Sequence, residues 1–165
     1  MQTSKQYFRS LSLIHYALLA GQLVFAGVAL YLTYGKTQLV DSPKGVFIYV
    51  VPLIALLAVL VSQAIYRLKI KKLISYQSLI PKMTEYQSIF IIRLALIEGA
   101  SLFAIVVYLL TIEAIFMAIA VLLIVYFVLL RPTREKIALD LELNPSDKMK
   151  LEQADALIAD IQEKK

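Results

Sequence analysis

The sequence contains no cysteine, a single histidine and only five glycines among its 165 residues. Without cysteine, the chain can form no disulfide, no thiolate metal site and no cysteine nucleophile. One histidine and so few glycines leave little material for a metal cluster or a phosphate-binding loop. We therefore expect neither a metal nor another cofactor.

Charged residues are also scarce, at 18% of the chain against roughly 25% in soluble domains. Hydrophobic residues reach 60%. A water-soluble domain of this length could not bury that much apolar surface in one core. The lipid bilayer is therefore the expected solvent for most of the chain.

Long apolar segments predict four membrane-spanning helices, at about residues 11–34, 45–66, 88–110 and 114–130. The last two form one apolar stretch, which as a single helix would be roughly 64 Å long, about twice the hydrocarbon thickness. Thr111-Ile112-Glu113 is the polar place in this stretch where the chain can turn. The expected fold class is an all-α polytopic membrane protein, with residues 1–130 as its transmembrane domain.

Two capping patterns are expected to begin the first and third of these helices. They are Thr3 with Gln6 and Thr84 with Gln87, in which each side chain can pair with a free backbone amide of the other residue.

Residues 131–165, after Arg131-Pro132, are predicted to form a cytoplasmic amphipathic helical tail. Asn144-Pro145 is typical of a helix start. The residues expected on one apolar face of that helix are Leu151, Ala154, Ile158 and Ile161. The tail could dock on a partner, or rest as a solvated helix on the connection between spans two and three.

The distribution of basic residues predicts the orientation of the chain. The expected outer loops hold two basic residues, Lys36 and Lys44. The N-terminus, the connection between spans two and three and the start of span three hold eight: Lys5, Arg9, Arg67, Lys69, Lys71, Lys72, Lys82 and Arg93. Because cytoplasmic loops are enriched in Lys and Arg, both termini are expected in the cytoplasm and the protein in the cell (inner) membrane. No basic stripe interleaved with aromatic residues occurs outside the spans, so no nucleic-acid partner is expected.

Spans one and three resemble each other in sequence. Residues 8–33 laid over 86–111 pair identical residues without a gap, among them Ala17 with Ala95 and Gly21 with Gly99. A duplicated two-helix hairpin would explain this pattern. Since small residues four apart let two helix backbones approach closely, we hypothesise that spans one and three cross through these four residues.

Glu98 is a carboxylate within the third span, where an unpaired charge is costly. It must be protonated, paired or hydrated, and could bind an ion or a proton or serve only in helix packing. Gln22, Ser101 and His15 could join it in one polar cluster between spans one and three, which is the ion- or proton-binding candidate. Arg93 lies roughly 140° around the helix from Glu98 and is expected to reach the cytoplasmic headgroups instead.

A family resemblance rests on residues 92–104, which read IRLALIEGASLFA. The segment resembles the ion-carrying helix of the proteolipid c subunits of rotary ATPases, and the resemblance implies that Glu98 binds the coupling ion. Outside this segment the chain departs from that family, since residues 46–65 contain no glycine and the tail has no counterpart. As a whole, the chain is similar to the small four-span integral membrane proteins of bacteria, which implies no particular activity.

Two functions follow from these features. The first is a non-catalytic structural or accessory subunit of a membrane assembly, which contacts the bilayer and, through the tail 144–165, a partner or copies of itself. The second is a proton- or ion-coupled translocation element that uses Glu98. An enzyme is not expected, because the sequence offers no paired carboxylates, Ser–His spacing, metal ligands or phosphate loop.

Overall fold

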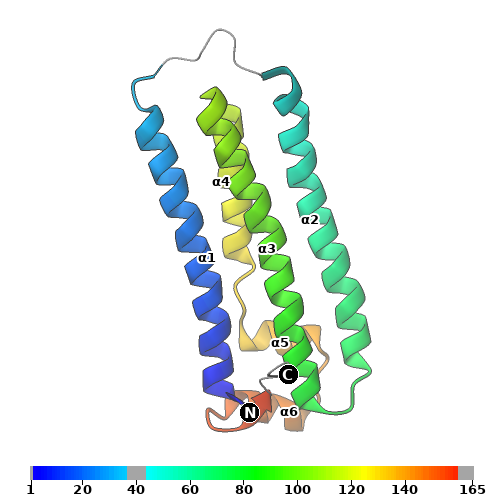
Figure 1. Ribbon diagram of the computed structural model, residues 1–165. Coiled ribbons are helices and arrows are strands. Elements are labelled where there is room, and N and C mark those ends of the chain that lie inside the picture. The colour runs from blue at the N-terminus through cyan, green and yellow to red at the C-terminus, as the bar shows by residue number, and fades with distance from the viewer. Residues whose placement is uncertain (1, 37–43, 160–165) are drawn as a thin grey trace, which may run out of the picture. The chain divides into compact units, whose positions relative to one another are not determined.

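The structure, a computed structural model, describes residues 2–36 and 44–159 and is dominated by helices (Figure 1). The helices are α1 (Ser4–Thr33), α2 (Lys44–Ile74), α3 (Leu79–Thr111), α4 (Ala114–Leu129), α5 (Arg134–Asp140) and α6 (Pro145–Glu152). Two short strands, β1 (Gln2–Thr3) and β2 (Leu157–Ala159), pair antiparallel.

Three of these helices are long and apolar enough to cross a membrane, judged by length and composition in the described part of the chain. They are Ser4–Thr33, Gly45–Ile74 and Leu79–Thr111. α4 and α5 make a fourth candidate span if the pair, bent by 83°, is taken as one. The prediction of membrane-spanning helices is confirmed in this form.

The chain divides into two compact units, and α1, α2 and α3 each contribute to both. As far as the residues are described, unit 1 comprises Met1–His15, Ala64–Arg93 and Arg131–Lys165. Unit 2 comprises Tyr16–Gln63 and Leu94–Leu130.

Unit 2 has the dimensions and surface of a membrane domain. Its segments of α1, from Tyr16, and of α3, from Leu94, are each about 27 Å long at about 1.5 Å per residue. The hydrocarbon core of a bilayer is about 30 Å thick. Most of the exposed large hydrophobic side chains in the described chain belong to this unit, such as Val24, Leu53 and Leu122.

The core of unit 2 takes residues from all four long helices. Its buried members are Ala26, Ala29, Val51, Ala104, Ile105, Val107, Tyr108, Phe116, Met117 and Ala120. Four of the ten are alanines, which let the helices pack closely here, while many larger aliphatic side chains of this unit are exposed. A bilayer favours this arrangement, because apolar side chains gain nothing by leaving lipid and helices are held by close packing instead.

The turn between α3 and α4 occurs at the predicted tripeptide. α3 ends at Thr111, whose hydroxyl donates to Val107 O at 2.8 Å and accepts from Glu113 N at 3.3 Å. Ile112 has a φ of 56°, in the left-handed region. This conformation is unfavourable for a β-branched residue, and it reverses the chain without Gly or Pro.

α4 ends at Leu129, close to the predicted stop at Arg131-Pro132. Proline has no amide hydrogen and disfavours a helical conformation at the residue before it, so the helix cannot continue. The corresponding helix α2 runs on to Ile74 without such a break. The two hairpins therefore differ in length, and the internal duplication stays a prediction.

The first capping prediction is confirmed and the second is wrong. Thr3 N donates to Gln6 Oε1 at 3.1 Å, and Gln6 N donates to Thr3 Oγ1 at 3.3 Å. Thr84 instead lies inside α3, which begins at Leu79, and its hydroxyl donates to Ile80 O at 3.0 Å. Pro81 falls in the first turn of α3, where amide hydrogens have no intrahelical partner and proline is tolerated.

The tail is only partly helical, which corrects the prediction of one amphipathic helix. Asn144 caps α6 as expected, with its Oδ1 accepting from Asp147 N at 2.8 Å. The helix ends at Glu152, and Ile158 lies in β2. Leu151 and Ile158 are buried while Ala154 is exposed, and Ile161 lies outside the described residues. Pairing of β2 with the N-terminal strand outweighs the helical pattern.

Unit 1 is closed by contacts between the two ends of the chain. The amides of Ser4 and Lys5 donate to Ala156 O at 2.8 Å and to Ala154 O at 3.1 Å. The Ser4 hydroxyl donates to Leu151 O at 2.6 Å. These bonds hold the tail against the beginning of α1.

Glu142 offers a test of the local geometry that ends α5. It has a φ of 46°, while Glu142 N and Leu143 N donate back to Leu139 O at 3.2 Å and Ala138 O at 3.1 Å. This is the Schellman arrangement, in which glycine is preferred at the left-handed residue. Glu142→Gly is expected to raise the free energy of unfolding by about 0.5–1 kcal/mol, measured by thermal unfolding in detergent.

The matched control is Glu135→Gly, an exposed position within the same helix. It is expected to lower the stability by up to about 1 kcal/mol, because glycine is a poor helix former. A loss of stability in both variants would contradict the assignment of Glu142 as the strained residue.

Candidate functional site

Polar side chains within unit 2 form hydrogen bonds between helices. The Ser101 hydroxyl on α3 donates to Gln22 Oε1 on α1 at 2.6 Å, and both residues are fully buried. The Gln22 amide donates in turn to Leu18 O at 3.4 Å. Two of the four predicted cluster residues, Gln22 and Ser101, are therefore in contact. Their hydrogen bond pairs polar groups for which lipid offers no partner.

Two further pairs extend this pattern. Thr33 on α1 and Tyr108 on α3 share a hydrogen bond of 2.8 Å between their hydroxyl groups. The Gln63 amide on α2 donates to the Tyr126 hydroxyl on α4 at 2.9 Å. The sequence shows that these residues are polar or aromatic. It does not show which of them pair, because the partners are more than sixty positions apart.

Glu98 lies apart from the Gln22–Ser101 pair. Its backbone carbonyl accepts from the Ser101 hydroxyl at 3.2 Å, but the side chain is partly exposed on the surface of unit 2. Among the described residues, no hydrogen bond or ion pair is formed by its carboxylate. His15 is buried and belongs to unit 1, so a four-residue cluster stays a prediction.

The small residues Ala17, Gly21, Ala95 and Gly99 are all exposed within a single chain. A Cβ added at Gly21 or Gly99 would meet no described atom within 4 Å. The proposed crossing of spans one and three through these residues is therefore wrong for one chain. α1 and α3 use other faces, on which Gln22 and Ser101 lie. Gly99 and Ala95 instead border a shallow apolar groove of about 350 Å³, with Ala58 of α2 on its other side.

A second polar cluster, absent from the sequence-based predictions, lies in unit 1. The Tyr66 hydroxyl on α2 donates to Asp140 Oδ2 on α5 and lies 3.2 Å from the Tyr86 hydroxyl on α3. Tyr66 and Tyr86 are buried. The cluster therefore joins three elements and holds the first helix of the tail in place.

Arg93 completes this cluster, contrary to the expectation that it reaches the headgroups. Its guanidinium lies 4.2 Å from the centre of the Tyr66 ring, and the residue is only 6% exposed. A cation over a tyrosine ring is attracted by the negative face of the ring, more strongly when desolvated. Nε of Arg93 has no hydrogen-bond partner among the described residues. The contact with the Tyr66 ring therefore helps to offset the cost of burying this charge.

The sequence held only a weak signal for this cluster. Tyr66 closes an apolar span, where tyrosine usually marks the membrane interface. Asp140 lies in the segment 137–143, in which apolar and acidic residues alternate without a clear helical or strand period. A buried hydroxyl needs a partner, but no local pattern indicates which carboxylate supplies it.

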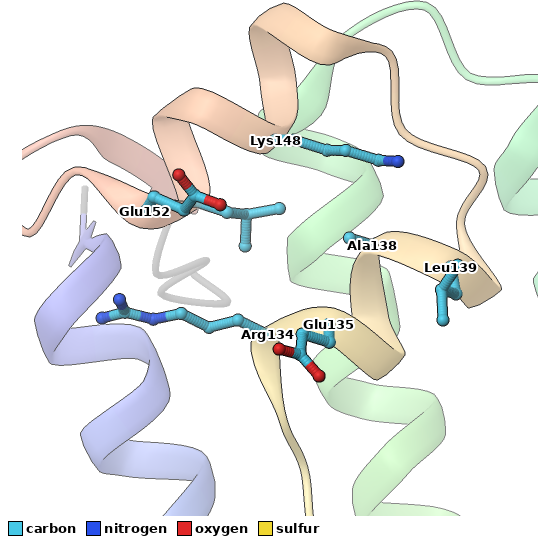
Figure 2. Close-up of a pocket in the computed structure, with 7 residues that line it drawn as sticks. Arg134, Glu135, Ala138, Leu139, Lys148 and Glu152 are labelled. Atoms are coloured by element: carbon cyan, nitrogen blue, oxygen red, sulfur yellow. The ribbon is translucent and has the colours of Figure 1, made fainter.

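A groove with a volume of about 320 Å³ lies between α5 and α6 in unit 1. Figure 2 shows Arg134 and Glu135 on the α5 side and Lys148 and Glu152 on the α6 side. Ala138, Leu139 and Leu151 provide its apolar lining. Leu139 is 71% exposed, so the groove presents an uncovered apolar side chain between charges of both signs.

No group of three or more His, Asp or Glu side chains that could hold a metal ion occurs among residues 2–36 and 44–159. Comparison with known proteins finds no matching family model, no matching curated protein and no matching solved structure.

Tyr66→Phe tests the cluster of unit 1. The substitution keeps the ring under Arg93 but removes the hydroxyl, which leaves the half-buried Asp140 carboxylate without its donor. We expect a loss of about 1–3 kcal/mol in the free energy of unfolding. Hydrogen exchange should also become faster in α5.

Tyr76→Phe is the matched control, because the Tyr76 hydroxyl also donates to a carboxylate, Glu85 Oε1, at 3.3 Å but in an exposed position. Its effect should stay within about 0.5 kcal/mol. Equal effects of the two substitutions would show that the Tyr66–Asp140 bond does not hold α5.

Proposed function

We propose that this chain is a non-catalytic integral membrane protein that serves as a structural or accessory subunit of a membrane assembly. The observation that carries the proposal is the folded unit 1, in which the ends of the chain are tied together and α5 and α6 leave an open groove. A bundle that only crossed the membrane would need no ordered tail with an uncovered apolar centre. An apolar centre with a charged rim is typical of protein contact surfaces.

The topology that we propose is four spans with both ends in the cytoplasm, in a cell (inner) membrane. It is supported by the pairing of β1 with β2, because two paired ends must lie on the same side and require an even number of crossings. α4 would be the fourth span, at about 24 Å a little short of the hydrocarbon thickness, which local thinning of the bilayer can accommodate.

The groove between α5 and α6 is the surface through which the chain would bind its partner. A complementary partner would cover Leu139, Ala138 and Leu151 with apolar side chains. It would also place an acidic group near Arg134 or Lys148 and a basic group near Glu135 or Glu152 (Figure 2). This charge pattern selects a partner of mixed charge and disfavours a uniformly acidic or basic one.

Leu139→Arg tests this surface. A central apolar contact replaced by a charge is expected to weaken partner binding at least tenfold, or about 1.4 kcal/mol. The measurement is the amount of a stoichiometric partner, identified by mass spectrometry, that copurifies from native membranes in mild detergent.

The control is Met149→Arg, which changes an apolar side chain that is 60% exposed on α6 but does not line the groove. Both variants should unfold at the wild-type temperature. If the Leu139→Arg variant kept the partner, the groove would not be the surface that binds it. Recovery of copies of this chain alone would replace the partner with a homo-oligomer.

A second candidate function is proton- or ion-coupled translocation through Glu98, as the proteolipid resemblance implies. It is favoured by the position of the Glu98 side chain, which is partly exposed on the surface of unit 2 and separate from the Gln22–Ser101 pair. A carboxylate on a membrane-facing surface is costly unless it is protonated or binds an ion.

For this candidate we expect Glu98 to react slowly with a hydrophobic carbodiimide, because such reagents modify protonated carboxyl groups in membranes. The coupling ion should protect it, and Glu85, which is exposed in unit 1, should not be labelled in the same way. Peptide mass spectrometry provides the readout. Absence of labelling, together with a Glu98→Gln variant that behaves as wild type, would leave Glu98 a packing role alone.

A further inference from the structure

The positive charge of unit 1 is concentrated on the parts of α1 and α2 that adjoin the membrane-spanning segments. Within unit 1, these parts carry six exposed cations and no acidic residue: Lys5, Arg9, Arg67, Lys69, Lys71 and Lys72. The described tail instead carries five basic and six acidic residues, and in α6 Lys150 pairs with Asp147 at 3.3 Å. Among residues 2–36 and 44–159, these cations of α1 and α2 therefore form no ion pair, in contrast to Lys150 in the tail.

The part of α2 that belongs to unit 1 has basic residues on its exposed side and buried apolar residues on its other side. Ile70 is 7% exposed and Leu73 is 1% exposed, so this side of the helix is held by the core of unit 1. Arg67 and Lys71 follow each other at a spacing of four residues and share a face. Packing therefore fixes the helix and leaves its cations free of any ion pair among the described residues.

An apolar side chain lies among these cations. Leu68, between Arg67 and Lys69, is 71% exposed, although Ile70 and Leu73 on the same helix are buried. On α1, Leu13 is 68% exposed in the same way. Cations interleaved with exposed leucines on a helix are suited to the interface between lipid headgroups and acyl chains.

Arg67 follows Gln63, the last α2 residue of unit 2, by about 6 Å of helix rise, and Lys71 by about 12 Å. With Gln63 at the edge of the hydrocarbon core, the headgroup region extends about 5–8 Å further. Arg67 then lies within that region, and Lys71 lies within a Debye length, about 8–10 Å, of its outer edge. We propose that the α2 face formed by Arg67, Leu68, Lys69, Lys71 and Lys72 binds the headgroups of anionic phospholipids. The unneutralised charge and the leucine favour a lipid surface over an acidic protein or a nucleic acid.

The test uses the full chain in mixed micelles that contain either phosphatidylglycerol or phosphatidylcholine. Phosphatidylglycerol is expected to raise the unfolding temperature relative to phosphatidylcholine, because a ligand that binds only the folded state stabilises it. Each basic residue near an anionic surface contributes roughly fivefold in affinity. The variant Arg67→Gln, Lys69→Gln, Lys71→Gln, Lys72→Gln should therefore weaken phosphatidylglycerol binding by at least about a hundredfold, after allowance for screening.

The control variant Lys148→Gln, Lys150→Gln removes exposed cations from α6 and should keep the full response. Equal unfolding temperatures in phosphatidylcholine for all three proteins establish that the substitutions leave the fold intact. The proposal is overturned if the α2 variant keeps the response, or if the α6 variant loses it equally. It is also overturned if inorganic phosphate or a single-stranded oligonucleotide reproduces the stabilisation.

Discussion

The thickness of the hydrocarbon core, about 30 Å, is the constraint on which the rest of this protein depends. The segments of α1, α2 and α3 within unit 2 match that thickness, and most of their exposed large hydrophobic side chains are aliphatic, beside exposed tyrosines such as Tyr31 and Tyr49. Because lipid offers no hydrogen bonds, buried polar side chains on these segments require partners within the chain. Gln22 with Ser101, Thr33 with Tyr108 and Gln63 with Tyr126 meet this requirement.

Glu98 differs from these residues, since its side chain is partly exposed and its carboxylate has no hydrogen-bond or ion-pair partner among the described residues. A carboxylate on a surface that faced lipid would be costly unless it were protonated, bound an ion or were covered by a neighbouring protein. The exposed small residues Ala95 and Gly99 lie on the same helix and would let a neighbouring helix approach closely.

Unit 1 is held together by its tail. Backbone bonds from Ser4 and Lys5 to the segment before β2 join the two ends of the chain. The Tyr66–Asp140 bond and the stacked Arg93 fasten α5 to α2 and α3. These contacts fix the tail in a defined position, so that α5 and α6 form an ordered surface. They leave the α5–α6 groove and the basic side of α2 exposed among the described residues of unit 1.

Local patterns predicted much of the fold but few of its long-range contacts. The capping pair Thr3–Gln6, the turn at Thr111-Ile112-Glu113 and the Asn144 cap were predictable because each depends on residues a few positions apart. The start of α3 was missed because Pro81 is tolerated in a first turn, and the tail helix was overextended because Ile158 pairs with the distant N-terminus. The Gln22–Ser101 pair was anticipated from two polar groups in apolar spans, whereas Tyr66 and Asp140 gave no such signal.

The sequence by itself determined the helical class, the presence of long apolar helices that could span a membrane, and the turn at Thr111-Ile112-Glu113. These properties depend on composition and on neighbouring residues, which the chain order contains directly. The tertiary structure alone decided which helix faces meet, that the small residues Gly21 and Gly99 point outward, and that the tail returns to the beginning of α1. Such choices depend on the packing of residues far apart in the chain, where many pairings satisfy the same pattern and only one fills space.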